Sequence, residues 1–244
     1  TGTSNIIIGA GAGSTTTDVD RAVIIGHDAG GAGDITAAAD GTIAIGYSAL
    51  TALTSGADNV AIGNNAGAAI TTGARNTIVG DIAGDASGNA ISDNVLIGYD
   101  AGGGSNNVAN ENVLIGSECG GDVRGGDATV AIGYHAIGAG ALAGDQNVAI
   151  GYVSGQQLAA GAYNTFVGGS SGLALTAGSD NVAIGYQALD AANAGESDNV
   201  ALGSGAMSAV DEGQNDSSGA ANIDDNIAIG KNAFMGGDLG DHND

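Results

Sequence analysis

A five-residue segment ending in glycine recurs thirteen times along the chain, as in Asn59-Val60-Ala61-Ile62-Gly63. The closing glycines are Gly9, Gly26, Gly46, Gly63, Gly80, Gly98, Gly116, Gly133, Gly151, Gly168, Gly185, Gly203 and Gly230. Most intervals between them are 17 or 18 residues, and the two longer ones are 20 and 27. A fixed period of this size is typical of a solenoid, in which each repeat buries its apolar side by stacking on its neighbours. We therefore expect an all-β fold, a parallel β-solenoid of about thirteen coils of 17-18 residues.

The composition favours a narrow core. The chain has 47 glycines, no proline, no tryptophan and only 3% aromatic residues. Few large side chains are available to fill a sandwich or barrel, whereas a thin coil needs only small and β-branched residues. We divide the chain into a repetitive solenoid over residues 1-203, an inserted acidic loop over 204-225, and a terminal coil with a flexible acidic tail over 226-244.

The charge of the chain limits its partners. Four basic residues stand against 27 acidic ones, so the formal net charge is -23. Such a field repels nucleic acid and anionic membrane surfaces, and no run of eighteen apolar residues is present for membrane insertion. The single cysteine, Cys119, excludes an intrachain disulfide framework. We expect an extracellular or virion-borne protein that works at high ionic strength or with screening cations.

Eleven of the thirteen repeats carry three consecutive apolar residues before the closing glycine, and the other two begin this triplet with Thr77 or Thr165. The residues one and three places before the glycine lie on one side of a strand, and we expect them to form the inner core. The residue between them points the other way, and we expect an identical chain to cover it, giving a homo-oligomer and most simply a homotrimer. This expected oligomer interface comprises Ile7, Ile24, Ala44, Ala61, Ile78, Leu96, Leu114, Ala131, Ala149, Phe166, Ala183, Ala201 and Ala228.

Other positions of the repeat also have predictable roles. Asparagine stands four places before the glycine in ten units, and stacked copies can form an amide ladder. The closing glycine supplies a tight corner. Three places beyond it stands a small residue, which is Cys119 in the seventh unit. We interpret the remaining half of each coil as a second short strand followed by a turn.

The repeat resembles two known families of fibrous proteins. Asn147-Val148-Ala149-Ile150-Gly151 and Thr129-Val130-Ala131-Ile132-Gly133 are similar to head repeats of trimeric autotransporter adhesins (YadA-like). The unit from Asn181 to Leu189 is similar to repeats of phage tail-fibre proteins. Both resemblances imply left-handed β-rolls or related β-solenoids that assemble as trimers and serve attachment. No apolar heptads run through this chain, which favours a fibre segment or a free-standing filament subunit over an autotransporter.

Two columns of the repeat are candidate binding sites. A tyrosine follows the closing glycine at Tyr47, Tyr99, Tyr134, Tyr152 and Tyr186. An aromatic face with a hydroxyl tip suits contact with a host glycan or protein, although these rings could equally cover the coil corner. Acidic residues precede the ladder asparagine, and Asp180 and Asp198 should stack on adjacent coils. A Ca²⁺ ion could relieve their repulsion, with solvated carboxylates as the alternative.

The sequence offers no arrangement that suggests catalysis. His27, His135 and His242 are scattered, and Cys119 falls in the small-residue position of its coil. We therefore predict a non-enzymatic structural and adhesive fibre protein, either a phage tail fibre or a surface adhesin head. A self-assembling extracellular filament is the first alternative. An ice-binding solenoid is a weaker one, because the threonines do not form a single file.

Overall fold

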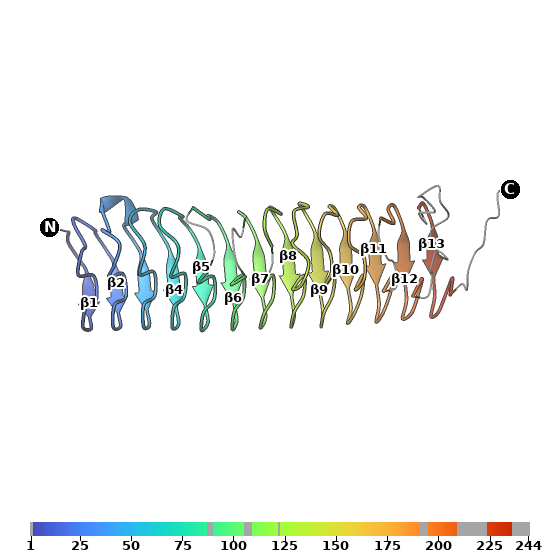
Figure 1. Ribbon diagram of the computed structural model, residues 1–244, viewed down its shortest axis with the longest axis horizontal. Helices are drawn as coiled ribbons and strands as arrows, with labels where there is room; N and C mark the ends of the chain where they lie inside the picture. Colours follow the sequence, from blue (N-terminus) through green and yellow to red (C-terminus); the bar gives the residue numbers. More distant parts are fainter. Residues whose placement is uncertain are drawn as a thin grey trace.

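The computed structural model describes residues 2–86, 90–104, 109–121, 123–190, 195–208 and 224–235. Thirteen strands of three residues each lie side by side in one parallel sheet, in the order of the sequence, and Figure 1 shows them running across a long rod. The strands are β1 (Ile6–Ile8), β2 (Val23–Ile25), β3 (Ile43–Ile45), β4 (Val60–Ile62), β5 (Thr77–Val79), β6 (Val95–Ile97), β7 (Val113–Ile115), β8 (Val130–Ile132), β9 (Val148–Ile150), β10 (Thr165–Val167), β11 (Val182–Ile184), β12 (Val200–Leu202) and β13 (Ile227–Ile229). The parallel β-solenoid predicted from the repeat is therefore confirmed.

The repeat sets the register of the sheet, because every residue of a strand pairs with the residue at the same place in the next coil. Ala44 pairs with Ala61, for example, and Phe166 pairs with Ala183. The backbone N–H of each closing glycine continues the pairing, as in the 2.8 Å bond from Gly63 N to Ile45 O. Insertions between repeats consequently leave the stacking of the strands unchanged.

The closing glycines form the corners that the sequence predicts. Gly63 has a φ of +145°, and a Cβ added to it would overlap the carbonyl oxygen of Gly80 in the next coil. The corner therefore needs glycine for two reasons, since both the backbone angle and the close approach of the neighbouring coil exclude a side chain.

The expected orientation of the strand residues is wrong. The middle residue of each strand points into the coil, and from β2 to β13 it is almost completely buried within the single chain. The residues predicted to form an oligomer interface are therefore interior residues: Ile24, Ala44, Ala61, Ile78, Leu96, Leu114, Ala131, Ala149, Phe166, Ala183, Ala201 and Ala228. Ile7 occupies the same position in the first coil and is 42% exposed.

The narrowness of the coil explains this orientation. A Cβ added to Gly67 would lie 3.1 Å from Ile78 Cδ1, and one added to Gly172 would lie 2.9 Å from the ring of Phe166. The wall opposite the strand thus lies directly against the middle residue, and alanine fits there in seven coils. The residues on either side of it face outward, because successive side chains of a strand point to opposite faces.

The rest of each coil contains turns in place of the predicted second strand. Among the described residues, the only pairing outside the thirteen strands is an isolated bridge between Val123 and Leu142, and one short 3-10 helix, η1, spans Ala37–Ala39. Residues two and four places beyond the closing glycine have positive φ, as at Asn65 (53°) and Gly67 (61°). Left-handed residues at alternate positions prevent a strand, although hydrogen bonds such as Leu50 N to Ala66 O (3.0 Å) still join the coils.

The asparagine ladder is confirmed. Asn76 Nδ2 donates to Asn59 Oδ1 at 2.9 Å, and Asn94 Nδ2 donates to Asn76 Oδ1 at 3.1 Å. The same bonds recur from Asn147 through Asn226. These amides are buried, so the ladder satisfies polar groups that would otherwise be costly inside the rod.

Some predicted segments cannot be compared with the structure. Most of the proposed acidic loop, residues 209–223, and the proposed flexible tail, residues 236–244, lie outside the described residues. Across the described ranges, no helix has the length and apolar character needed to cross a membrane.

Candidate interaction surface

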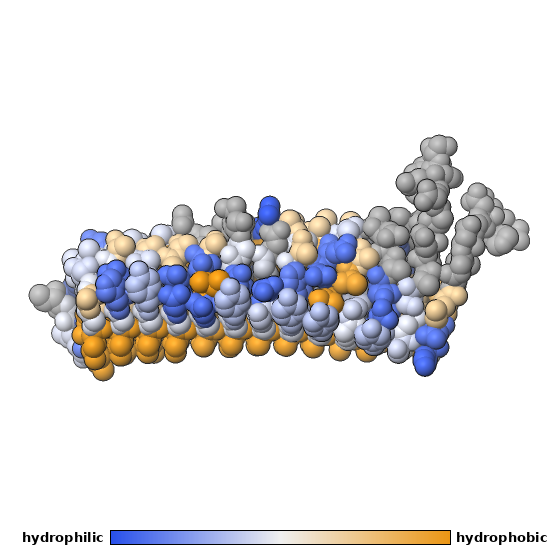
Figure 2. Space-filling model, turned by 60° about the horizontal axis from the view of Figure 1, so that its bottom comes forward, coloured by the Kyte–Doolittle hydropathy of each residue, from blue (hydrophilic) through white to orange (hydrophobic). Residues whose placement is uncertain are grey.

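The first and last residues of the strands β1–β13 form a continuous exposed strip, which we call the apolar face. Every one of these residues is isoleucine, valine or leucine except Thr77 and Thr165. Their side chains are partly exposed along the middle of the rod, with Ile184 42% exposed. Figure 2 shows the strip as an orange band along one side of the molecule. These residues were assigned to the core from the sequence, so the sequence interpretation missed the surface that they form.

The dimensions of the apolar face are those of an interaction site. At about 4.8 Å per strand, thirteen strands make a strip roughly 58 Å long. A width of about 10 Å then gives an area of roughly 600 Å², at the upper end of the ~300–600 Å² of the largest apolar patch on a typical monomer. None of the 27 acidic residues lies in the strip. The chain therefore keeps its surplus charge away from this one face.

Two columns of mainly exposed residues flank the apolar face. The upstream edge is the residue five places before each closing glycine, and the downstream edge is the residue one place after it. The upstream edge consists of Ser4, Arg21, Gly41, Asp58, Arg75, Asp93, Glu111, Ala128, Gln146, Tyr163, Asp180, Asp198 and Asp225. The downstream edge consists of Ala10, His27, Tyr47, Asn64, Asp81, Tyr99, Ser117, Tyr134, Tyr152, Gly169, Tyr186, Ser204 and Lys231.

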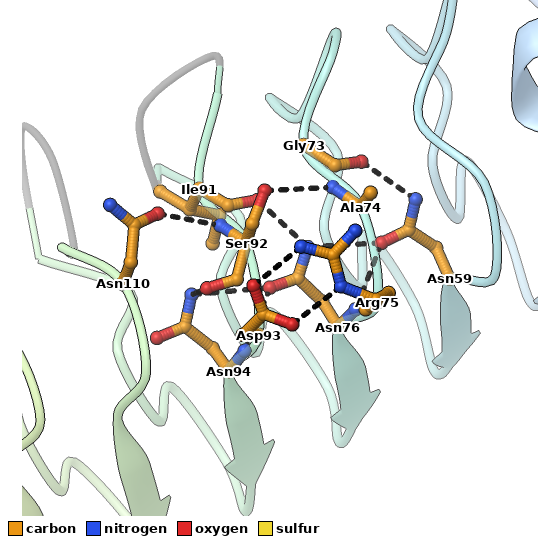
Figure 3. A network of polar contacts seen from close by, with 10 residues as sticks. All are labelled: Asn59, Gly73, Ala74, Arg75, Asn76, Ile91, Ser92, Asp93, Asn94 and Asn110. Carbon is orange, nitrogen blue, oxygen red and sulfur yellow. Dashed lines mark hydrogen bonds and ion pairs between the residues drawn. The ribbon is translucent and has the colours of Figure 1, made fainter.

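The upstream edge has a left-handed backbone and carries acidic side chains. Its non-glycine residues have φ near +60°, such as Asp58 (59°) and Asp180 (60°). Arg75 forms a bidentate ion pair with Asp93, at 2.6 Å and 2.7 Å, which Figure 3 shows. These hydrogen bonds hold the pKa of the exposed Asp93 carboxyl below its usual range and raise the pKa of Arg75.

A second ladder of side chains runs beside the asparagine ladder and was not predicted. Ser92 Oγ accepts a hydrogen bond from Ala74 N at 3.1 Å, and Asn110 Oδ1 accepts one from Ser92 N at 2.9 Å (Figure 3). Asp127 and Asp145 continue the pattern. The signal in the sequence is the repeated aspartate, serine or asparagine two places before the ladder asparagine, because these residues accept hydrogen bonds from nearby backbone.

The predicted tyrosines lie on the downstream edge and are exposed. The rings of Tyr134 and Tyr152 stack with centroids 5.5 Å apart and an interplanar angle of 17°. Tyr47 stacks in the same way on the ring of His27, at 5.5 Å and 12°. Tyr99 and Tyr186 are also more than half exposed. The structure thus places five tyrosines in one column beside the apolar face, available to a partner.

The predicted calcium position gains no further ligands. Asp180 and Asp198 lie on adjacent coils of the upstream edge. Within the described ranges, no three or more histidine, cysteine, aspartate or glutamate residues gather where they could hold a metal ion. Calcium binding at Asp180 and Asp198 stays a prediction from the sequence.

Cys119 is a structural residue of the coil interior. Its Sγ lies 3.1 Å from the carbonyl oxygen of Ala131, and Ser154 and Ser171 make equivalent contacts in their coils. Burial raises the pKa of the Cys119 thiol to about 12, so the reactive thiolate is suppressed at neutral pH. The small-residue position of the seventh coil is therefore occupied by a buried thiol.

The histidines lie in separate surroundings. His27 Nδ1 is 3.0 Å from Asp28 Oδ2, and His135 Nδ1 is 2.8 Å from Gln156 Nε2. His135 Nε2 also lies 3.6 Å from Glu118 Oε2. His242 lies outside the described residues. The two described histidines are distant along the rod, on the second and eighth coils, and do not belong to a common site.

Comparison with known proteins adds no family to this description. No protein-family model, no curated protein and no solved structure matched the chain.

Proposed function

We propose that this chain is a non-enzymatic structural rod of an extracellular attachment fibre, in which three copies pack side by side through the apolar face. The observation that carries the proposal is the apolar face itself, an uncharged strip along the whole rod on a chain with a formal charge of -23. A strand that is apolar on both sides is normally buried on both sides. Copies of the same chain supply a matching strip of equal length and equal spacing.

The size of the apolar face supports self-association. In a trimer the strip of roughly 600 Å² is divided between two neighbours, about 300 Å² toward each, and the flanking edges would supply the rest of the ~800 Å² per partner of a standard specific interface. Three copies around a common axis would each cover two neighbours, leaving the polar turns of the coils outside. The acidic side chains of the described coils that do not belong to the two edges would then lie on the outer surface, where they favour solubility.

The tyrosines of the downstream edge are the residues that would attach the fibre to a host surface. The stacked pair Tyr134 and Tyr152 would lie at the outer rim of the proposed interface between copies, where its rings and hydroxyl groups can reach a host glycan or protein. The double variant Tyr134→Ala/Tyr152→Ala should keep the fold, because both side chains are exposed, and should lose binding to the host surface. Retained binding in this variant would remove the tyrosines from the attachment role.

Mass in solution tests the assembly directly. Sedimentation at micromolar concentration should give three times the chain mass of 23.0 kDa, and negative-stain images should show short discrete rods. A monomer would overturn the proposal, and thermal hysteresis in that monomer would favour the ice-binding alternative. Indefinite filaments would instead support end-to-end polymerisation.

A further inference from the structure

We infer that the copies pack parallel and in register, with the upstream edge of each copy against the downstream edge of the next. This inference rests on the side-by-side assembly proposed above and identifies the residues that would align it. A rotation axis parallel to the rod brings opposite edges of neighbouring copies together. Because the strands run across the rod, the two edges of one coil lie at nearly the same height (Figure 1), so each coil meets its own equivalent.

The acidic residues support this pairing, since it places no acidic residue opposite another. Six upstream residues are acidic: Asp58, Asp93, Glu111, Asp180, Asp198 and Asp225. The downstream residues of the same coils are Asn64, Tyr99, Ser117, Tyr186, Ser204 and Lys231. The downstream edge has one acidic residue, Asp81, and the upstream residue of that coil is Arg75. Complementary charges of this kind fix the register of an interface.

The basic residues are concentrated on the same two edges. The chain has four lysine and arginine residues, and three of them, Arg21, Arg75 and Lys231, lie there. Lys231 has no ion-pair partner among the described residues of its own chain, and in-register packing places it opposite Asp225 of a neighbouring copy. Arg75, which already binds Asp93, would also face Asp81. Arg21 would face His27, which is neutral in the formal charge count.

The shapes of the edges match in the tenth coil. Gly169 is the one glycine of the downstream edge, and Tyr163 is the one tyrosine of the upstream edge. Nothing within the chain requires glycine at position 169, because its φ is not positive and an added Cβ would make ordinary contact, at 3.5 Å from Tyr186 Cδ2. Tyr163 is 55% exposed. In-register packing sets this protruding ring against the vacant glycine position of the next copy.

On the apolar face, the tenth coil and the fifth coil differ from all the other coils. Thr77 and Thr165 are the polar residues of that face, and each shares its strand with a valine, Val79 or Val167, where most coils have isoleucine. Neither hydroxyl has a hydrogen-bond partner in the described part of the chain. Parallel copies in register bring equivalent threonines to one height, where the hydroxyls can bond to each other, and a polar position inside an apolar seam specifies register.

An antiparallel arrangement lacks this complementarity. Two rods packed face to face in opposite directions would bring their upstream edges together. Full overlap would place Glu111 opposite Glu111, and a shift by one coil would place Asp58 opposite Asp180. Like charges held opposite each other destabilise such contacts.

Paired cysteines test the register. In a Cys119→Ala background, the double variant Glu111→Cys/Ser117→Cys puts one thiol on each edge of the seventh coil. The two thiols of one chain are separated by a strand of about 20 Å, too far for an intrachain disulfide. Oxidation should therefore give covalent dimers and trimers on a non-reducing gel. The matched control Glu111→Cys/Ser204→Cys has its thiols in different coils and should stay uncrosslinked.

Charge exchange gives a second, independent readout. Lys231→Glu should raise about tenfold the protein concentration at which half of the trimer dissociates, because the new carboxylate would face the carboxylate of Asp225 in the neighbouring copy. The double variant Asp225→Lys/Lys231→Glu should restore assembly to nearly the wild-type midpoint.

The outcomes separate this inference from the proposed function. A monomeric wild-type protein would overturn both. A trimeric protein in which the offset cysteines crosslink as well as the matched pair, or in which the exchanged charges fail to rescue assembly, would overturn the in-register packing alone.

Discussion

The backbone N–H of Thr129 donates a hydrogen bond of 2.8 Å to Oδ1 of Asn112, yet the two side chains remain incompletely bonded. Asn112 Nδ2 and Thr129 Oγ1 are buried and have no hydrogen-bond partner in the described part of the chain. Thr129 stands where most coils have the ladder asparagine, so the side-chain bond between β7 and β8 is missing, and the unbonded Asn112 Nδ2 leaves the bond between β6 and β7 missing as well. An unbonded polar group in the interior costs free energy that a bonded one does not.

Replacing Thr129 by asparagine should repair the ladder. The new Nδ2 would donate to Asn112 Oδ1, as Asn76 does to Asn59 at 2.9 Å. We expect Thr129→Asn to raise the free energy of unfolding by about 1 kcal/mol in denaturant titration. The reverse control, Asn164→Thr, breaks an intact part of the ladder and should lower it by a similar amount. Equal stability of both variants and the wild type would show that the ladder contributes nothing.

Two neighbouring residues of β8 test the orientation of the strand. Ile132 lies on the apolar face, whereas Ala131 is fully buried in the coil. Ile132→Asp should leave the far-ultraviolet circular dichroism unchanged and reduce the mass in solution to that of one chain. Ala131→Asp should unfold the coil around it, since an isolated carboxylate in the interior is very costly. The opposite pattern would restore the interior assignment that the sequence suggested.

The closing glycines should be far less tolerant than other glycines. Gly98 has a φ of +138°, and a Cβ there would overlap the carbonyl oxygen of Gly116. Gly98→Ala should therefore lower the free energy of unfolding by about 3 kcal/mol or more. Gly125→Ala, at a glycine whose added Cβ would make only ordinary contact with Ala143 Cα at 4.0 Å, should change it by less than about 0.5 kcal/mol in denaturant titration. Similar losses in both variants would contradict the role of the corner.

Stability should fall in alkaline solution because of Cys119. Burial raises the thiol pKa from 9.0 to about 12, so the folded state holds the proton more tightly than the unfolded state. The contribution of the protonated Cys119 thiol to the free energy of unfolding is fully present below pH 9 and is lost as the pH rises from 9 toward 12. Denaturation at pH 7 and at pH 10.5 should show a smaller alkaline loss in Cys119→Ala than in the wild type. An identical loss would assign the alkaline effect to other groups.

Much of the fold could be predicted from single columns of the repeat. The closing glycine, the ladder asparagine and the small-residue position each favour a narrow set of residue types for a local physical reason, and the structure confirms all three. The second half of the coil could not be predicted in the same way. Its left-handed residues include Leu50 and Ile137, and leucine and isoleucine are residue types from which a positive φ would not be predicted.

The orientation of the strand needed the tertiary structure, although one clue was present. Asn59 and Ala61 are two residues apart and therefore lie on the same side of their strand, and both are buried. The ladder asparagine thus pointed to the alanine side as the interior. The apolar character of both sides concealed this signal, because either side of Val60-Ala61-Ile62 could have filled a core.

The sequence by itself determined a stacked solenoid, its thirteen strands and their register, because a repeat of nearly constant length can bury its apolar residues only against its own copies. The tertiary structure decided which side of each strand is inside. The wall opposite the strand packs directly against the middle residue, and because side chains alternate along a strand, the valine and isoleucine on either side of it point outward. That packing, which no single repeat expresses, turned the expected core columns into the surface on which the proposed function rests.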